Sequence, residues 1–592
     1  MNTRDCDVLI TLAHKQYTTQ RALSQDCGYA LGTINQSLQN LSKEGYLNAH
    51  NGLSEKANQL LARQSPRNAI ILAAGFGMRM IPINLETPKG LLEVKGEPLI
   101  ERMIDQLHRV GIYEIHVVVG FMKEQYEYLI DKYGVNLIVN PEYAIKNNLH
   151  SLKYAIKHLS NSYIMPCDLW CRDNPFSKYE LYPWYMVSTK TDESSTVRVN
   201  RNKNLVAVRE SENGNQMLGI TYLTEEQSAV VRAKVNQLCK HSKYNDSFWE
   251  EALHNDGKMS VAAKVVSDKD VIEINTYEQL RELDRASMQL HTAAVSTIAG
   301  VMGVSIDELT DIEALKKGMT NRSFLFSCKG NKYIMRIPGE GTDLLINRAE
   351  EAVVYSQVGG RNICEDIVYL NPENGYKITK YFEGARVCDP LNEADLRCSM
   401  KKLREFHCQK LVVDHCFDIF GQIEFYESLW QGAQSVYRDY EITKQNVFSL
   451  KAFIDEHQLP YVLTHIDAVP DNFLFVNDSN GQTQVHLIDW EYAGMQDPHV
   501  DIAMFCIYSM YDREQVDNLI DLYFEDECTW ENRIKIYCYI ASCGLLWSNW
   551  CEYKRLLGVE FGEYSLRQYR YAKDYYRIVQ TEIQKKGGWA NA

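Results

Sequence analysis

The spacing of apolar residues changes twice along this chain, near residues 67 and 290, and each change predicts a different kind of fold. Residues 1–66 carry apolar positions at helical spacing. In residues 67–290, continuous apolar runs alternate with amphipathic stretches. From residue 291 on, strand-like segments come first and long helical patterns follow. A chain of 592 residues is too long for one hydrophobic core, so we expect three domains with the boundaries 1–66, 67–290 and 291–592.

The first region predicts a winged helix-turn-helix. DVLITLAHKQ, QRALSQDCG and ALGTINQSLQNLSKEGYL have the spacing of three helices, and the polar segment NAHNGLSEKANQLL is a candidate wing. The third helix offers amide and hydroxyl side chains that can contact base edges. Six Lys and Arg against five Asp and Glu make the region poor in charge for a DNA-binding module. DNA binding, self-association and nucleotide sensing therefore all remain open for it.

Composition narrows the class of protein. The formal net charge of −15 argues against non-specific nucleic-acid binding by the whole molecule. No apolar run approaches the ~18 residues of a membrane span, and the amino terminus lacks the apolar core of a signal peptide. The sixteen cysteines form no CxxC pair and no Cys/His cluster. We expect a cytoplasmic protein without membrane insertion, with reduced thiols and no structural zinc site.

A loop of small residues follows the first buried strand of the second region. The run NAIILAAG predicts a parallel strand, and the strand–helix–strand order that follows predicts a Rossmann-like domain with a mostly parallel sheet. Small residues in the loop let backbone amides approach a nucleotide closely. Arg79 and Lys89 bring two cations to the same edge of the sheet for the phosphates. The predicted nucleotide-binding residues of the loop are Leu72, Ala74, Gly75 and Gly77.

These segments resemble the nucleotidyltransferases that activate sugar phosphates and phosphocholine, whose signature is LAAGxGxRxxP…TPKxL. NPEY at 140–143 and NNLHSL at 147–152 are similar to the bacterial phosphocholine cytidylyltransferase branch. The resemblance implies CTP and phosphocholine as substrates and Mg²⁺ held by Asp168 and Asn275. Asn275 stands where that family often carries Asp, and an amide oxygen can still ligate a hard cation. Phe248 and Trp249 are candidate contacts for the choline cation, and packing in the core is the alternative for each.

A second constellation lies in the third region. Asp467 is followed by Asn472 in HIDAVPDN, and Asp489 follows an apolar strand in LIDWEY. This is the arrangement of a kinase base and two magnesium ligands. Asp467 would accept the proton of a substrate hydroxyl, and the other two residues would hold Mg²⁺ at the ATP phosphates.

Residues 300–592 resemble the choline/ethanolamine and aminoglycoside kinase superfamily, which implies a bilobal, protein-kinase-like domain. The resemblance assigns a phosphate-covering hairpin to Gly318, Thr320 and Asn321. It also implies that Arg336 binds phosphate and pairs with Glu351. Asp501 would be the later structural aspartate of that superfamily.

A tryptophan pair indicates the substrate class of the kinase. Trp547 and Trp550 lie three residues apart and share one face of a predicted helix. Tryptophan faces bind quaternary ammonium groups, and with Tyr492 and Glu491 the pair would form an aromatic cage with one carboxylate. A Trp pair packed in the core is the alternative, and the neighbouring kinase motif favours the cage.

Together these motifs predict a multidomain α/β and α+β enzyme that uses ATP to phosphorylate choline and couples the phosphocholine to CTP, making CDP-choline. The main rival is a sugar-phosphate nucleotidyltransferase fused to a sugar or aminoglycoside kinase. The same pathway acting on ethanolamine is a second alternative. A metabolite-sensing transcriptional regulator is a third, although the catalytic residues look intact.

Overall fold

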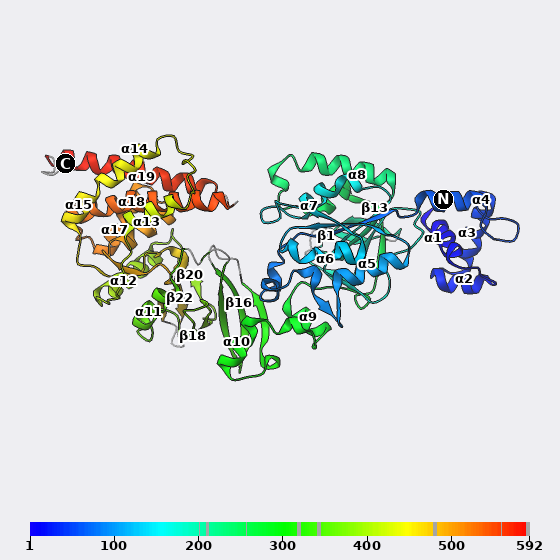
Figure 1. Ribbon diagram of the computed structural model, residues 1–592, viewed down its shortest axis with the longest axis horizontal. Helices are drawn as coiled ribbons and strands as arrows, with labels where there is room; N and C mark the ends of the chain where they lie inside the picture. Colours follow the sequence, from blue (N-terminus) through cyan, green and yellow to red (C-terminus); the bar gives the residue numbers. More distant parts are fainter. Residues whose placement is uncertain are drawn as a thin grey trace. The chain divides into compact units, whose positions relative to one another are not determined.

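The structure is a computed structural model of the chain (Figure 1). It describes residues 1–592 except 194, 201, 209–211, 256, 316–320, 340–341, 343–344, 478–481, 558, 560 and 588–592. The chain forms two compact units, one of residues 1–297 with 311–314 and one of residues 298–310 with 315–592. The first unit contains the predicted winged helix and nucleotidyltransferase regions, and the second contains nearly all of the predicted kinase region.

The amino-terminal module has four helices. They are α1 (Thr3–His14), α2 (Gln20–Cys27), α3 (Leu31–Lys43) and α4 (Glu55–Gln64). A β-bridge between Leu47 and Leu53 closes the turn after α3. The expected wing is shorter than predicted, because the Ser54 side chain accepts a hydrogen bond from the Ala57 amide and starts a helix there.

This module is anchored to the sheet domain that follows it in the same unit. Leu181 belongs to the hydrophobic core of the module. The hydroxyl groups of Tyr182 and Tyr29 donate to the two oxygens of Asp7 on α1, at 2.6 and 2.5 Å. The winged helix is therefore packed against the sheet domain and is not joined to it by a linker alone.

A ten-stranded mixed sheet forms the centre of the first unit, in the order β5-β4-β1-β6-β11-β8-β13-β10-β9 with β12 beside β13. The pairs β5–β4, β4–β1 and β1–β6 are parallel, which confirms the Rossmann-like prediction for this half. The strands are β1 (Asn68–Ala73), β4 (Glu114–Val119), β5 (Asn136–Val139), β6 (Ser162–Pro166), β8 (Trp184–Asp192), β9 (Val197–Val199), β10 (Asn204–Ala207), β11 (Gly214–Leu223), β12 (His254–Asn255) and β13 (Lys258–Val266).

Both faces of the parallel half are covered by helices (Figure 1). Alternate residues of β1 point to opposite faces. Ile71 packs in the core that contains residues of α5 (Leu99–Arg109), and Ile70 packs in the core that contains residues of α7 (Asn148–Ala155) and α8 (Glu225–Leu238). Burial on two faces explains why β1 is a continuous apolar run.

The remaining α-helices and strands that the structure describes up to residue 314 are two short two-stranded ribbons, three helices and one further strand. They are β2 (Glu93–Val94) with β3 (Glu97–Pro98), β7 (Leu169–Cys171) with β14 (Val271–Glu273), α6 (Tyr128–Tyr133), α9 (Tyr277–Leu283), α10 (Ala293–Met302) and β15 (Thr310–Ala314). The β7–β14 ribbon pairs Glu273 with Leu169. It therefore brings the residues just outside the ribbon, Asp168 and Asn275, to the same end.

The second unit begins with an antiparallel sheet. Its strands β16 (Asn321–Cys328), β17 (Asn331–Pro338), β19 (Lys377–Lys380) and β18 (Ile367–Leu370) are adjacent in that order. The helix α11 (Arg348–Val358) lies between β17 and β18 in the chain. The small β lobe predicted from the sequence is confirmed.

A larger, mostly helical lobe follows. Its helices are α12 (Glu393–Cys408), α13 (Ile419–Ser428), α14 (Tyr440–Ser449), α15 (Lys451–His457), α16 (Val500–Tyr508), α17 (Arg513–Phe524), α18 (Trp530–Leu556) and α19 (Glu563–Lys585). Its strands are β20 (Arg386–Val387), β21 (Val462–Thr464), β22 (Phe473–Asn477), β23 (Thr483–Leu487) and β24 (Gly494–Gln496). The side chains of α18 are buried without a break from Ile534 to Lys554, so this helix is the centre of the lobe.

Among the described residues, no helix combines the length and the apolar composition that a membrane span requires.

Candidate active sites

The loop after β1 brings backbone groups and a lysine together. Gly77 has a φ of 70°, in the left-handed region that favours glycine. A Cβ on Gly77 would lie 2.9 Å from Cγ of Lys89, so glycine here leaves room for the lysine side chain. A Cβ on Gly75 would meet nothing within 4 Å. This open space beside the loop is consistent with the predicted approach of a nucleotide.

Lys89, Asp168 and Asn275 meet at the end of the β7–β14 ribbon. The ammonium group of Lys89 donates to Oδ2 of Asp168 at 2.8 Å and to Oδ1 of Asn275 at 2.7 Å. Arg79 donates to the same Asn275 oxygen at 3.0 Å. Four residues chosen from separate sequence motifs thus form one site, with two cations against one carboxylate and one amide.

The oxygen atoms of this site fit a magnesium ion. Oδ1 of Asp168 is buried and has no hydrogen-bond partner among the residues that the structure describes. Oxygen donors from a carboxylate and an amide are ligands that a hard cation accepts. Asp168 and Asn275 would hold the ion, which would supply positive charge at the nucleotide phosphates.

Two half-buried carboxylates near this site were not predicted from the sequence. Burial raises the pKa of Glu273, on β14, and the charge of Asp168 adds to the shift. Burial also raises the pKa of Glu250 to about 7. Tyr185 donates to Oε1 of Glu250 at 2.9 Å, while Oε2 has no partner in the described part of the chain. The strand alternation in VIEIN could have indicated Glu273, which lies two residues before Asn275.

Trp249 lies next to Glu250 but is a core residue in this structure. Its side chain is 1% exposed and belongs to one of the two cores of the sheet domain. Its ring lies 6.3 Å from that of Tyr185. A contact between Trp249 and the substrate stays a prediction.

In the second unit, the motif after β21 places a base and an amide together. Nδ2 of Asn472 donates to Oδ2 of Asp467 at 3.0 Å and to its backbone carbonyl at 2.8 Å. Burial raises the pKa of Asp467 to about 7, and the charge of Glu491 adds to the shift. A carboxyl group with such a pKa can accept a proton near neutral pH.

Asp501 holds the backbone of this loop. Ile466 has a φ of 67°, a strained value for a β-branched residue. The two oxygens of Asp501 accept hydrogen bonds from the amides of Ile466 and His465, at 2.7 and 3.0 Å. His407 contacts the same carboxylate at 2.9 Å. These bonds stabilise the turn that aims Asp467, as expected for a structural aspartate.

Asp489 has the second carboxylate of the kinase site. Its φ of 66° lies in the left-handed region. Burial raises the pKa of Asp489, and the charge of Glu491 adds to the shift. A cation bound here would relieve this cost, so Asp489 and Asn472 fit the predicted magnesium ligands.

Arg336 and Glu351 form the predicted ion pair between β17 and α11. The guanidinium donates to the two carboxylate oxygens at 2.5 and 2.8 Å. Nη1 of Arg336 also lies 3.7 Å from Oδ1 of Asp489, which places it beside the expected phosphates. Gly318 and Thr320 lie outside the described residues.

Glu491 links this ion pair to the rest of the site. Its Oε2 accepts hydrogen bonds from Asn321 at 2.8 Å and from Arg348 at 3.2 Å. Arg348 also donates a hydrogen bond to Glu351, a bridging role that was not predicted from the sequence. Glu491 therefore has protein partners in addition to any role beside a substrate cation.

An aromatic cavity of about 350 Å³ adjoins the kinase residues. The ring of Trp547 packs edge-on against Trp550 at 5.5 Å and against Tyr492 at 5.7 Å. Tyr508 and Tyr564, which the sequence analysis missed, complete the aromatic lining. The cavity residues are Asp467, Val469, Asp471, Asn472, Asp489, Glu491, Tyr492, Met504, Ile507, Tyr508, Trp547, Trp550 and Tyr564.

Three family models match separate parts of the chain. A winged helix-turn-helix DNA-binding model matches residues 1–48, a MobA-like NTP transferase domain matches residues 69–179, and a choline/ethanolamine kinase model matches residues 312–535.

A choline-phosphate cytidylyltransferase of Streptococcus pneumoniae is 30% identical over 220 residues, which are 36% of this chain and 96% of the relative. The chain belongs to the choline-phosphate cytidylyltransferase family. A 2-aminoethylphosphonate cytidylyltransferase of Lancefieldella rimae is 28% identical, over 38% of this chain and 94% of that protein. The protein LicA of Haemophilus influenzae is 27% identical, over 42% of this chain and 76% of that protein.

The chain is thus a transferase with a cytidylyltransferase domain and a choline kinase family domain. The structure brings the predicted residues of each domain into one site, apart from the buried Trp249 and the undescribed Gly318 and Thr320. The catalytic role of each residue stays a prediction.

Proposed function

We propose that this chain makes CDP-choline in two steps, first as a choline kinase and then as a phosphocholine cytidylyltransferase. The observation that carries the proposal is the cavity in which Trp547, Trp550 and Tyr492 lie at the same site as Asp467 and Asp489. Aromatic faces bind a quaternary ammonium without hydrogen bonds. The same cavity therefore offers a place for the cation and a base for the hydroxyl of choline.

In the kinase step, the hydroxyl oxygen of choline attacks the γ-phosphorus of ATP and ADP leaves. Asp467 accepts the hydroxyl proton, and its raised pKa suits a base that works near neutral pH. Asn472 and Asp489 would hold Mg²⁺, which neutralises charge on the phosphates. Arg336, fixed by Glu351, adds a positive charge beside Asp489.

In the cytidylyl step, a phosphate oxygen of phosphocholine attacks the α-phosphorus of CTP and pyrophosphate leaves. No covalent nucleophile is required, so positioning and charge stabilisation supply the catalysis. Lys89 and Arg79 would move from Asp168 and Asn275 onto the phosphates when the nucleotide binds. The half-buried carboxylate of Glu250 is the candidate partner for the substrate cation.

One assay tests both steps. The purified full chain is incubated with ATP, CTP and Mg²⁺ together with choline, ethanolamine or 2-aminoethylphosphonate, and the products are resolved by mass. We expect phosphocholine and CDP-choline to form faster than the products of the two primary amines. Transfer of cytidylyl to 2-aminoethylphosphonate in preference to phosphocholine would overturn the cytidylyl assignment, and preferred phosphorylation of ethanolamine would overturn the choline assignment.

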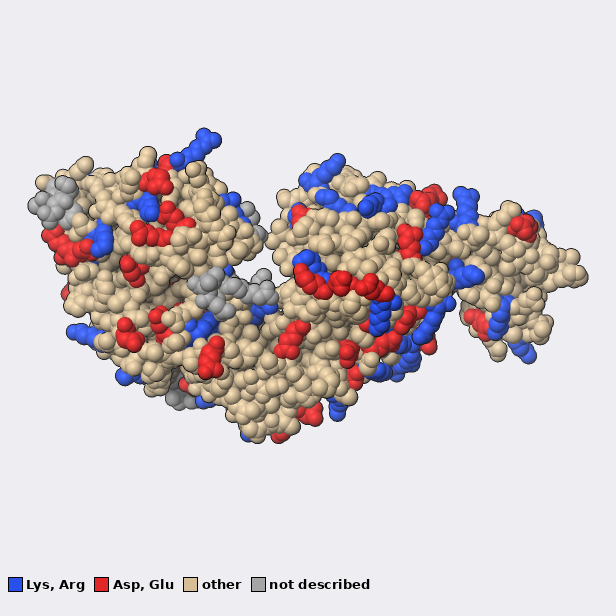
Figure 2. Space-filling view, in the orientation of Figure 1, with Lys and Arg blue, Asp and Glu red and all other residues tan. Residues whose placement is uncertain are grey.

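We also propose that the winged helix takes part in DNA binding or self-association. Its support is the match to a winged helix-turn-helix DNA-binding model. Asn35, Gln36 and Gln39 are exposed on α3. Figure 2 shows both basic and acidic side chains over this module on the face drawn. Gel-shift and sedimentation experiments on the full chain separate the two roles.

A further inference from the structure

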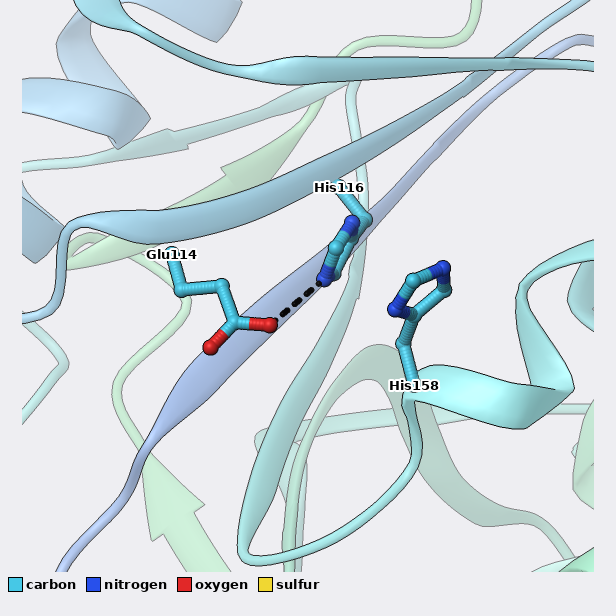
Figure 3. A group of neighbouring side chains, drawn as sticks. All are labelled: Glu114, His116 and His158. Atoms are coloured by element: carbon cyan, nitrogen blue, oxygen red, sulfur yellow. Dashed lines mark hydrogen bonds and ion pairs between the residues drawn. The ribbon is translucent and has the colours of Figure 1, made fainter.

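Two histidines and a glutamate gather where the parallel strand β4 begins, at the opposite strand end from the nucleotide loop; Figure 3 shows the three side chains. Glu114 and His116 lie two residues apart on β4, so their side chains point to the same face. His158 ends the short helix before β6. Its backbone carbonyl accepts a hydrogen bond from Asn68 of β1 at 2.8 Å, which fixes its position.

The three side chains lie within reach of a common ion. Nε2 of His116 lies 3.2 Å from Oε1 of Glu114, and the rings of His116 and His158 are 3.7 Å apart between centroids. One ligand atom from each residue lies within 4.8 Å of the others. Ligand atoms of a tetrahedral zinc site lie about 3.4 Å apart, given bonds of ~2.1 Å. Glu114 and His116 are already that close, so only the distances to His158 need to shorten, by about 1.4 Å at most.

The side chains of Glu114 and His158, which must move to bind an ion, are accessible to solvent. His116 is 3% exposed and held by its strand, while the side chain of Glu114 is 57% exposed and His158 is half-buried. The two rings now stack at 28°. Lone pairs of imidazole lie in the ring plane, so binding requires the ring of His158 to tilt out of the stack.

The chemistry of the histidines suits a metal. Burial lowers the pKa of His158, and the neighbouring His116 and Lys157 lower it further. A neutral imidazole is the form that binds metals. Nδ1 of His116 is buried and has no hydrogen-bond partner among the described residues. Burying a polar nitrogen without a partner costs free energy.

We propose that Glu114, His116 and His158 bind a divalent transition-metal ion of the zinc type, with water completing its coordination. Imidazole and carboxylate ligands favour such an ion over Mg²⁺, which prefers oxygen ligands alone. The site lies at the amino end of β4, whereas the nucleotide loop follows the carboxyl end of β1. Glu114 pairs with Asn68 and His116 with Ile70 in the β1–β4 register, so the two residues lie about 20 and 13 Å of strand before Ala74 of the loop. The ion would therefore connect β4 to the segment before β6 and would take no part in catalysis.

The test measures zinc and cobalt binding to the full chain after metal removal. We expect the wild type to bind one equivalent more than His158→Gln or Glu114→Gln, with an affinity loss of at least tenfold in each variant. His241→Gln, at an exposed histidine of the same unit, is the matched control and should bind like the wild type. Zinc should raise the Tm of the wild type and of this control but not of the two cluster variants.

Equal metal binding by the wild type and the cluster variants would overturn the proposal and leave a stacked pair of neutral histidines. His158 and Glu114 are solvent-accessible, so their variants should fold. Circular dichroism spectra like that of the wild type would show that they do, and both variants should retain pyrophosphate release from CTP and phosphocholine with Mg²⁺. A loss of that release in folded His158→Gln, with metal binding intact, would also contradict the proposed role.

Discussion

The charge state of the Asp467 carboxyl group controls the proposed kinase activity. The carboxyl group is half-buried, the charge of Glu491 lies nearby, and the hydrogen bond from Asn472 offsets only part of the cost of ionising it. Its pKa rises to about 7 as a result. The same burial that makes the group a stronger base also makes its activity sensitive to pH near neutrality.

This pKa predicts an acidic limb in the pH profile of the kinase. Below pH 7 the carboxyl is protonated and cannot accept the hydroxyl proton, so kcat/KM for choline should fall by about tenfold per pH unit. Glu491→Gln removes one cause of the raised pKa and should move the limb to lower pH. Initial rates between pH 5 and 9 measure both, and a wild-type limb below pH 5 would contradict the role of Asp467.

The tryptophan pair predicts a selective loss of choline affinity. Trp547→Ala and Trp550→Ala should each raise the KM for choline about 5- to 30-fold, because ~1–2 kcal/mol of cation–π contact is lost. The KM for ATP should change less, and ethanolamine should suffer less than choline. Trp530→Ala, at a Trp on the same helix outside the cavity, is the control. Equal losses for choline, ethanolamine and ATP would mean that the pair is only core.

At the scale of elements, loops fixed by tertiary contacts hold both sites. The kinase loop depends on Asp501 of α16, whose carboxylate accepts hydrogen bonds from two backbone amides of the loop. The cytidylyltransferase loop depends on Gly77, whose missing side chain leaves space for Lys89. In each case a residue with no proposed contact to substrate positions a proposed catalytic residue: Asp501 positions Asp467, and Gly77 positions Lys89.

Gly77→Ala should therefore disable one activity and spare the other. The added Cβ would displace Lys89, and the positive φ would add about 1–2 kcal/mol of strain. We expect CDP-choline formation to fall by about 100-fold while choline phosphorylation is retained. Gly96→Ala, also at positive φ but with open space around it, controls for the strain alone. Equal effects of the two substitutions would contradict the steric argument.

At the scale of the whole molecule, the two catalytic domains belong to different compact units. Each unit has its own hydrophobic core and its own proposed metal ligands. Two units with separate cores need no shared residue for their chemistry, so their activities should be separable by mutation.

Single substitutions should separate them. Asp467→Ala should abolish ATP-dependent phosphorylation of choline and leave cytidylyl transfer to added phosphocholine within a few-fold. Asp168→Ala and Lys89→Ala should do the reverse. Coupled assays of ADP and pyrophosphate release on the same preparations measure both. Loss of both activities in one variant, with the fold intact by circular dichroism, would show that the domains are not independent.

The sequence alone determined the order of the folds and most of the candidate site residues, because strand runs, loop glycines and the spacing of Asp467 and Asn472 are local patterns. Tertiary structure alone decided what lies beside them. Arg348, Glu250 and the cluster of Glu114, His116 and His158 are brought to their partners by sheet register and helix packing across long sequence separations. Only the structure shows that Trp249 is buried, because the local sequence does not distinguish a core tryptophan from one that contacts a substrate.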